Sequence, residues 1–233
     1  MDEYTKQART YPAVIAAIVC SIPTTVFWGH IPCIYDFFAD WWHYLLLIIP
    51  TAVIYGALGS FFRELFRSTS KWLFQLPVFK EDETNMPTTD MLIYSKHLLS
   101  TDSINNISAK IESDYGVYLE DEEGQKKDEL NARLKIAEAV RMIRQNTRED
   151  KFLLRCNINY GFWRNLLGGW FWTMIITLAL TLISMYLDLG INCIMWASFI
   201  IELILFMLFM YVFMPQSGRE YARQLYTTYL NEK

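Results

Sequence analysis

The sequence has few of the features that mark enzymes and metalloproteins. Its four cysteines lie far apart and form no C-x-x-C pair, so nothing in it indicates a disulfide framework or a zinc site. Its three histidines are isolated, and no metalloprotease, P-loop, nucleophile-elbow or dinucleotide-binding motif occurs. We therefore predict no catalytic residue, no metal site and no cofactor, and we expect a protein that is not an enzyme.

Charged residues are scarce in two stretches of the 233-residue chain, residues 11–62 and 165–214. About 20 mostly apolar residues are enough to cross a bilayer as a helix. Four segments of this kind occur, running from about Tyr11 to Trp28, Trp41 to Phe62, Leu166 to Leu187 and Ile191 to Met214. A soluble globule spreads its charges more evenly, so this pattern predicts an all-α membrane protein.

The four segments are predicted to pair into two transmembrane hairpins with a helical cytoplasmic insertion between them. The expected boundaries are residues 1–62 for the first hairpin, 63–164 for the insertion and 165–214 for the second hairpin, with a cytoplasmic tail at 215–233. The connection inside the second hairpin is only about three residues long, which requires a tight turn.

Basic residues are absent from the loops that join the paired segments. All 21 lysines and arginines lie in residues 1–10, 63–164 and 219–233, whereas the two loops carry only three aspartates. Because lysine and arginine are retained on the cytoplasmic side of a membrane, we expect both termini and the insertion in the cytoplasm.

A stripe of hydroxyl groups follows one face of the third segment. Its members recur at helical spacing and end in an aspartate at the outer side: Thr173, Thr177, Thr181, Ser184 and Asp188. Such a face is suited to line a pore in an oligomer, with a ring of carboxylates that favours cations. The alternative is that each hydroxyl bonds the carbonyl group one turn earlier in its own helix.

Glu202 lies halfway along the fourth segment. An ionisable group there costs at least ~2.5 kcal/mol to insert, so it usually faces a bundle interior or a water path. We predict that Glu202 belongs to the pore. The alternative is a protonated carboxyl group bonded to a hydroxyl group of a neighbouring helix.

The second segment carries a face of small residues, Ala52, Gly56 and Ser60, with Ala57 beside them. Small residues four apart allow close helix packing in membranes. Packing inside one subunit and packing between subunits both remain open.

The insertion is predicted to contain several helices. Residues 63–75 extend the second segment, a loop follows at 77–90, and a helix runs from about Ile104 to Asp114 and stops at Gly116. The acidic run at 120–123 and Gly124 should break the pattern before a longer helix, about Lys127 to Thr147. Its apolar face is predicted to consist of Leu130, Leu134, Ala137 and Val140.

The longer helix also carries a basic face. Three of its arginines recur at i, i+3 and i+7, although the insertion as a whole is near neutral, with 16 basic and 17 acidic side chains. Such a face can contact the phosphates of a nucleic acid, or it can be a solvated surface. The candidate ligand residues are Lys126, Lys127, Arg133, Arg141, Arg144 and Arg148. Tyr94, Tyr115 and Tyr118 are available to stack on bases.

Three short motifs resemble a family of small bacterial four-span proteins. They are Met86–Thr89 (MPTT), Asn146–Asp150 (NTRED) and Asn159–Asn165 (NYGFWRN), and the resemblance covers nearly the whole chain. The family is expected to have P-T-T, T-R-[DE] and Y-G-F-R-R-N at these places. This chain departs from it with Trp163 in place of an arginine, and it lacks a more basic stretch after P-T-T.

The family is similar to the membrane effectors of the Hailong anti-phage defence system. That resemblance implies a homotetrameric ion channel in the bacterial inner membrane. It also implies a partner, single-stranded oligodeoxyadenylate made by a companion nucleotidyltransferase, which would bind the insertion and hold the channel closed. Phage infection would remove the ligand, open the channel and depolarise the cell. The alternative is a non-conducting membrane anchor or scaffold for a cytoplasmic partner.

Overall fold

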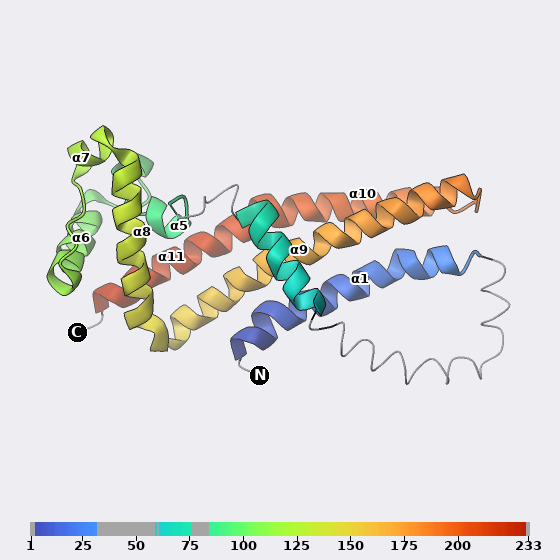
Figure 1. Ribbon diagram of the computed structural model, residues 1–233, viewed down its shortest axis with the longest axis horizontal. Helices are drawn as coiled ribbons and strands as arrows, with labels where there is room; N and C mark the ends of the chain where they lie inside the picture. The colour runs from blue at the N-terminus through green and yellow to red at the C-terminus, as the bar shows by residue number, and fades with distance from the viewer. Residues whose placement is uncertain (1–2, 32–58, 60, 76–83, 232–233) are drawn as a thin grey trace. The chain divides into compact units, whose positions relative to one another are not determined.

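The computed structural model of the protein describes residues 3–31, 59, 61–75 and 84–231 (Figure 1). Every regular element in these ranges is helical. The chain divides into two compact units. Unit 1 comprises Met1–Lys71 and Gly161–Val212, and unit 2 comprises Trp72–Tyr160 and Phe213–Lys233.

Unit 1 is built from long apolar helices. Element η1 (Thr5–Thr10) leads into α1 (Tyr11–Trp28), which has the limits predicted for the first membrane segment. Helix α9 (Lys151–Tyr186) is joined by a short turn to α10 (Asn192–Leu208), where the second hairpin was predicted, but α9 begins before residue 165. Helix α10 continues through η5 (Phe209–Phe213) into α11 (Met214–Asn231). Three stretches of the described chain are long and apolar enough to cross a membrane: Thr5–Trp28, Lys151–Tyr186 and Asn192–Asn231.

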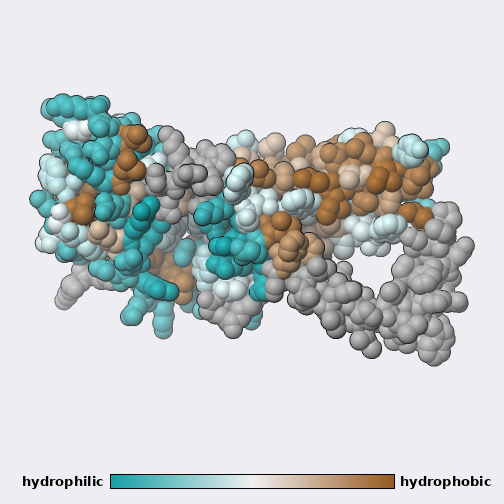
Figure 2. All heavy atoms as spheres, in the orientation of Figure 1, coloured by the Kyte–Doolittle hydropathy of each residue, from teal (hydrophilic) through white to brown (hydrophobic). Residues whose placement is uncertain are grey.

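These stretches agree with an all-α membrane protein. The predicted second segment, with its small-residue face at Ala52, Gly56, Ala57 and Ser60, lies outside the described residues except near its end. Many outward-facing side chains of α10 are large and apolar: Ile200, Ile201 and Ile204 are 51%, 58% and 62% exposed. Figure 2 shows hydrophobic residues gathered over α9 and α10. Such a surface is suited to contact lipid chains or another subunit.

The turn between α9 and α10 is as tight as predicted. Asp188 and Gly190 both have positive φ angles, 49° and 72°. Glycine adopts this left-handed conformation freely, and aspartate tolerates it better than most residues. Asp188 is exposed at this turn.

Close approach of three helices holds unit 1 together. Residues 61–69 are helical and lie against α9 at Gly168 and Gly169. A Cβ atom on Gly169 would lie 2.8 Å from the Cβ atom of Ala16 in α1, so only glycine fits there. The Asn165 amide donates to the backbone oxygen of Ala8 at 2.6 Å, and the Trp172 indole donates to the Thr69 hydroxyl at 2.9 Å.

The described residues of unit 2 share an apolar core made by several helices. They are α5 (Pro87–Asp90), α6 (Thr101–Tyr115), α7 (Glu122–Lys127), α8 (Glu129–Asn146) and the C-terminal α11. Ile107 of α6, Ile143 of α8 and Leu225 of α11 are each at most 1% exposed and belong to the same cluster. The predicted insertion and the predicted tail therefore form one body, while residues 63–71 and 161–164 belong to unit 1.

Side chains cap the helices of unit 2 as their sequences suggest. Ser100 accepts a bond from Ser103 N at the start of α6, and Asp121 and Asp128 do the same for α7 and α8. Gly116 ends α6 with φ 67°, which confirms the predicted stop.

Three local predictions differ from the structure. The loop expected at 77–90 includes α5 at its end, because Pro87 suits the first turn of a helix. Gly124, which was predicted to break the helical pattern, lies inside α7. That helix begins after its cap Asp121 and ends before Asp128. The buried face of α8 is only partly as predicted: Ala137 and Val140 are buried, but Leu130 and Leu134 are 58% and 40% exposed. Ile136, Ala139 and Ile143 are buried in their place.

Candidate functional site

The predicted hydroxyl stripe lies inside unit 1. Thr173 is 2% exposed, and Thr177, Thr181 and Ser184 are 0% exposed. Glu202 of α10 is 4% exposed and lies against this stripe. We call these five residues the polar seam. The structure brings them together within one chain and leaves Asp188, the sixth predicted pore residue, exposed at the turn.

The hydroxyl groups of the seam mostly bond to backbone. Thr181 donates to the carbonyl of Thr177 at 2.7 Å, and Ser184 lies 2.8 Å from the carbonyl of Thr181 and 3.0 Å from Asn192 Oδ1. Thr173 lies 3.3 Å from the carbonyl oxygens of both Gly169 and Ala16. Bonds of this kind satisfy hydroxyl groups in an apolar setting, so within one subunit the stripe also serves helix packing.

Glu202 is the exception in the seam. The Thr177 hydroxyl donates to Glu202 Oε1 at 3.0 Å, while Glu202 Oε2 is buried and has no hydrogen-bond partner among the described residues. The Trp170 indole donates to the backbone oxygen of Glu202 at 2.9 Å and thereby fixes α9 against α10 at this level. An unpartnered carboxylate oxygen in an apolar interior is costly, and such groups commonly mark functional positions in membrane proteins.

The predicted ligand residues of unit 2 fall into two sets. Arg141 and Arg148 are exposed on α8 and the turn after it, and Lys127 is exposed at the end of α7. Lys126 is also exposed and forms an ion pair with Glu122 at 2.7 Å. Arg133 and Arg144 point toward the interior of the unit.

Arg133 serves as a structural residue. It is 8% exposed and bonds Asp90 at 2.7 Å, Glu129 at 2.8 Å and the backbone oxygen of Thr84 at 2.8 Å. Burial opposes the charge of its guanidinium, but the bonds to the two carboxylates outweigh burial and raise its pKa. Arg133 is therefore engaged inside the protein and presents little surface to an external ligand.

Arg144 reaches the P-T-T motif. Its guanidinium donates to the Thr88 hydroxyl at 3.3 Å and lies 5.9 Å from the centre of the Tyr221 ring. The Tyr226 hydroxyl donates to the backbone oxygen of Thr88 at 2.6 Å. A Cβ atom on Gly218 would lie 3.2 Å from Pro87, so α11 approaches α5 closely. The P-T-T motif therefore joins α8 to α11, a role that its sequence alone does not reveal.

The other two motifs also have local structural roles. Thr147 donates to the carbonyl of Ile143 at 2.8 Å, and Asp150 accepts from Leu153 N at the start of α9. In the third motif, Gly161 leaves room for Ala8, because a Cβ atom added to Gly161 would lie 3.0 Å from the Cβ atom of Ala8. Asn165 forms the bond to Ala8 described above. Each motif therefore closes a turn or joins two helices.

Of the tyrosines predicted to be available for stacking, Tyr118 is the most accessible, at 57% exposure. Tyr115 stacks on Tyr229 with ring centres 6.0 Å apart, and the Tyr94 hydroxyl donates to Asn105 at 2.7 Å. Tyr221, beside Arg144, is half-buried and was not predicted.

Comparisons of the chain with models of protein families, with curated proteins and with solved structures found no match.

Proposed function

We propose that the protein is an oligomeric ion channel that acts as an anti-phage effector of the bacterial inner membrane. The observation that carries this proposal is Glu202, an acid that is 4% exposed in an apolar helix, with one carboxylate oxygen unpartnered among the described residues. Packing alone does not require an ionisable group at this depth. In the proposed channel, Glu202 and the hydroxyls of the polar seam form part of the ion path once α9 and α10 separate.

In this proposal the closed channel is held by single-stranded oligodeoxyadenylate bound to unit 2. Arg141, Arg148 and Lys127 are the exposed cations suited to its phosphates, with Arg144 behind them. Helix α9 begins in the sequence of unit 2 and continues into that of unit 1, where it carries the seam hydroxyls. A ligand that restrains the start of α9 therefore acts on the helix that forms the seam.

The energy required is within reach of such a ligand. Shifting a channel from mostly closed to mostly open takes a difference in binding free energy of about 5.5 kcal/mol between the two states. Each phosphate bound by a cation contributes to that difference, and a symmetric homotetramer multiplies the contribution of one subunit. The proposed trigger is the loss of the oligonucleotide on infection.

A non-conducting membrane scaffold is the second candidate. It is favoured by the seam hydroxyls, since each has a hydrogen-bond acceptor within the same chain. In that case unit 2 would bind a cytoplasmic partner and the membrane helices would serve only as an anchor.

The two candidates differ in their effect on membrane potential. Expression of the chain without a source of oligodeoxyadenylate should depolarise cells, as measured with a potential-sensitive dye. Glu202→Gln and Thr177→Leu should each change the extent of depolarisation at least several-fold, because both alter the bond between the Thr177 hydroxyl and the buried carboxyl group.

The matched control for these variants is Ser198→Ala. Ser198 is a half-buried residue of α10 outside the polar seam, and its hydroxyl bonds the carbonyl of Ile194 in its own helix, so its loss should leave the depolarisation unchanged. Full membrane potential in cells that hold the inserted wild-type protein would instead support the scaffold.

A further inference from the structure

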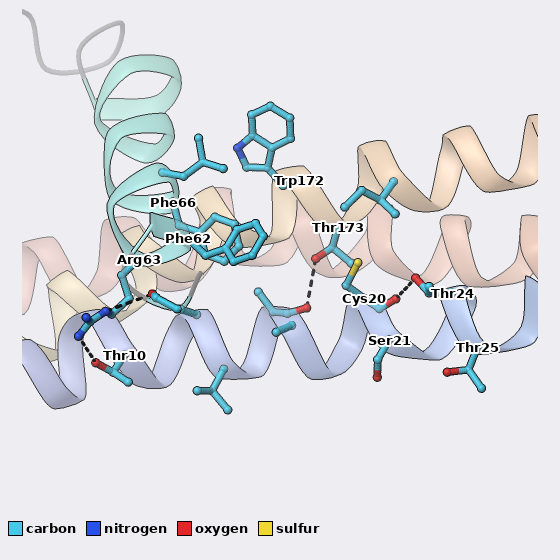
Figure 3. A pocket seen from close by; sticks show the side chains of 17 residues that line it. Thr10, Cys20, Ser21, Thr24, Thr25, Phe62, Arg63, Phe66, Trp172 and Thr173 are labelled. Carbon is cyan, nitrogen blue, oxygen red and sulfur yellow. Dashed lines mark hydrogen bonds between the residues drawn. The ribbon is translucent and has the colours of Figure 1, made fainter. Parts of the chain in front are cut away.

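A cavity of about 750 Å³ opens between α1, residues 59–66 and α9 within unit 1 (Figure 3). Phe62, Phe66 and Trp172 form one side of it, and small residues of α1, including Ala13 and Ala17, form the other. None of the hydroxyl groups of the polar seam except Thr173 lies in its wall. The cavity therefore meets the proposed ion path only at Thr173.

One end of the cavity carries a positive charge. Arg63 lines it, donating through Nη1 to the Thr10 hydroxyl and through Nε to the backbone oxygen of Gly59, both at 3.3 Å (Figure 3). These bonds hold the guanidinium at the level of Thr10, at the beginning of α1. The cation is therefore fixed at the edge of the apolar stretch of that helix.

Further basic residues lie in the chain segments that adjoin this end. The described part of unit 1 has six basic side chains, all within residues 3–10, 61–71 and 161–164: Lys6, Arg9, Arg63, Arg67, Lys71 and Arg164. The same ranges contain two acids, Glu3 and Glu64, and Glu64 is paired with Arg67 at 2.6 Å. The net charge at this end is positive, which is typical of segments that meet anionic lipid headgroups.

The rest of the cavity wall is suited to hydrocarbon. Ser21 donates to the carbonyl of Ile18 at 2.6 Å, and Thr24 donates to the carbonyl of Cys20 at 2.7 Å. Since these hydroxyl groups are bonded within α1, the wall next to them presents mainly methyl groups and aromatic rings. Such a wall favours an acyl chain over a polar metabolite.

We propose that this cavity is a binding site for an anionic glycerophospholipid. One acyl chain lies along α1 between Ala17 and Phe66, and the phosphate group binds Arg63 at the basic end. Tryptophan side chains prefer the headgroup level of a bilayer, and Trp172 lies in the wall of the same cavity. The proposal requires that α1 lies in a membrane, but it does not depend on ion conduction or on an oligonucleotide.

Native mass spectrometry of the full chain in detergent tests the proposal. After delipidation, phosphatidylglycerol or phosphatidylcholine with identical acyl chains is added. Both lipids carry a phosphate, but the choline cation of phosphatidylcholine cancels its charge, so the wild type should retain phosphatidylglycerol about tenfold more strongly at a basic site. Arg63→Gln should abolish this preference.

Arg67→Gln is the matched control, because it removes the same charge from a residue that bonds Glu64 and does not line the cavity. It should keep the preference for phosphatidylglycerol. Ala17→Phe, which fills the apolar part, should reduce the binding of both lipids while the helical circular dichroism stays unchanged.

Equal retention of the two lipids by the wild type would overturn the proposal, as would an Arg63→Gln variant that behaves like the wild type. If the wild type binds neither lipid and Ala17→Phe lowers its melting temperature, the cavity is filled by other residues of the chain and the proposal is wrong.

Discussion

At the scale of single residues, two buried charged groups have opposite surroundings. Glu202 in the membrane unit has one oxygen bonded to Thr177 and one without a partner among the residues described. Arg133 in unit 2 bonds two carboxylates and a backbone oxygen. Buried charges that are fully bonded usually serve the fold, while an incompletely bonded group is a better candidate for function. This contrast separates Glu202, predicted as a pore residue, from Arg133, predicted as a ligand residue.

The structural role of Arg133 is testable by substitution. Arg133→Met should destabilise the protein by roughly 3 kcal/mol, the lower end of the range for breaking a buried ion pair, because Asp90 and Glu129 keep partial access to solvent. The destabilisation would appear as a lower melting temperature of the detergent-solubilised chain.

Arg141→Met is the control for this substitution, since Arg141 is exposed and should change stability by no more than about 0.5 kcal/mol. A stable Arg133→Met variant that binds oligodeoxyadenylate poorly would instead place Arg133 in the ligand site.

At the scale of helices, the sequence predicted where the membrane helices lie better than it predicted which face of a helix is buried. Composition alone locates α1, because an apolar run with few charges has clear ends. Of the four residues predicted to form the buried face of α8, Ala137 and Val140 are buried, whereas Leu130 and Leu134 are exposed. Alanines and isoleucines fill the core instead, since α5 and α11 approach α8 closely. That approach depends on residues distant in sequence, which a periodic pattern does not reveal.

The packing at Gly168, where α9 meets the helix of residues 61–69, also depends on residues distant in sequence. A Cβ atom there would collide with the backbone oxygen of Phe66, which cannot move without displacing its helix. Gly168→Ala should therefore destabilise unit 1 by about 1–3 kcal/mol, the usual cost of overpacking. Thermal unfolding in detergent would measure the change.

Gly59→Ala is the matched control for Gly168→Ala. An added Cβ atom on Gly59 would meet nothing within 4 Å, and alanine favours a helix over glycine by up to about 1 kcal/mol. This variant should be as stable as the wild type or slightly more so. Equal stability of the Gly168→Ala variant would show that the two helices are not packed as described.

At the scale of the whole molecule, the predicted insertion and tail are one folded unit. Tyr229 of α11 stacks on Tyr115 of α6, and Lys110 of α6 donates to the backbone oxygen of Tyr229 at 2.7 Å. The buried residues of the tail, Ala222, Leu225, Tyr226 and Tyr229, recur at helical spacing, but this pattern does not reveal which helices they pack against. The consequence for the proposed channel is that unit 2 contains the start of α9 and all of α11, which are continuous with both helices of the second hairpin.

The proposed channel also predicts where its ligand binds. Arg141→Glu with Arg148→Glu should weaken the binding of oligodeoxyadenylate, because the variant no longer neutralises the phosphates that these arginines bind. The slope of log affinity against log salt should fall by about 0.7 for each such phosphate. Both side chains are exposed, so the fold should be unaffected. Arg223→Glu, at another exposed arginine of unit 2, should leave affinity and salt dependence close to those of the wild type.

The measurement that tests the central claim most directly is ion flux through liposomes that contain the purified chain, with and without added oligodeoxyadenylate. We predict cation flux through the wild type that stops when the oligonucleotide is added. Flux through the Arg141→Glu, Arg148→Glu variant should continue when the oligonucleotide is present. A wild-type protein that is inserted and folded but carries no ions under either condition would contradict this prediction.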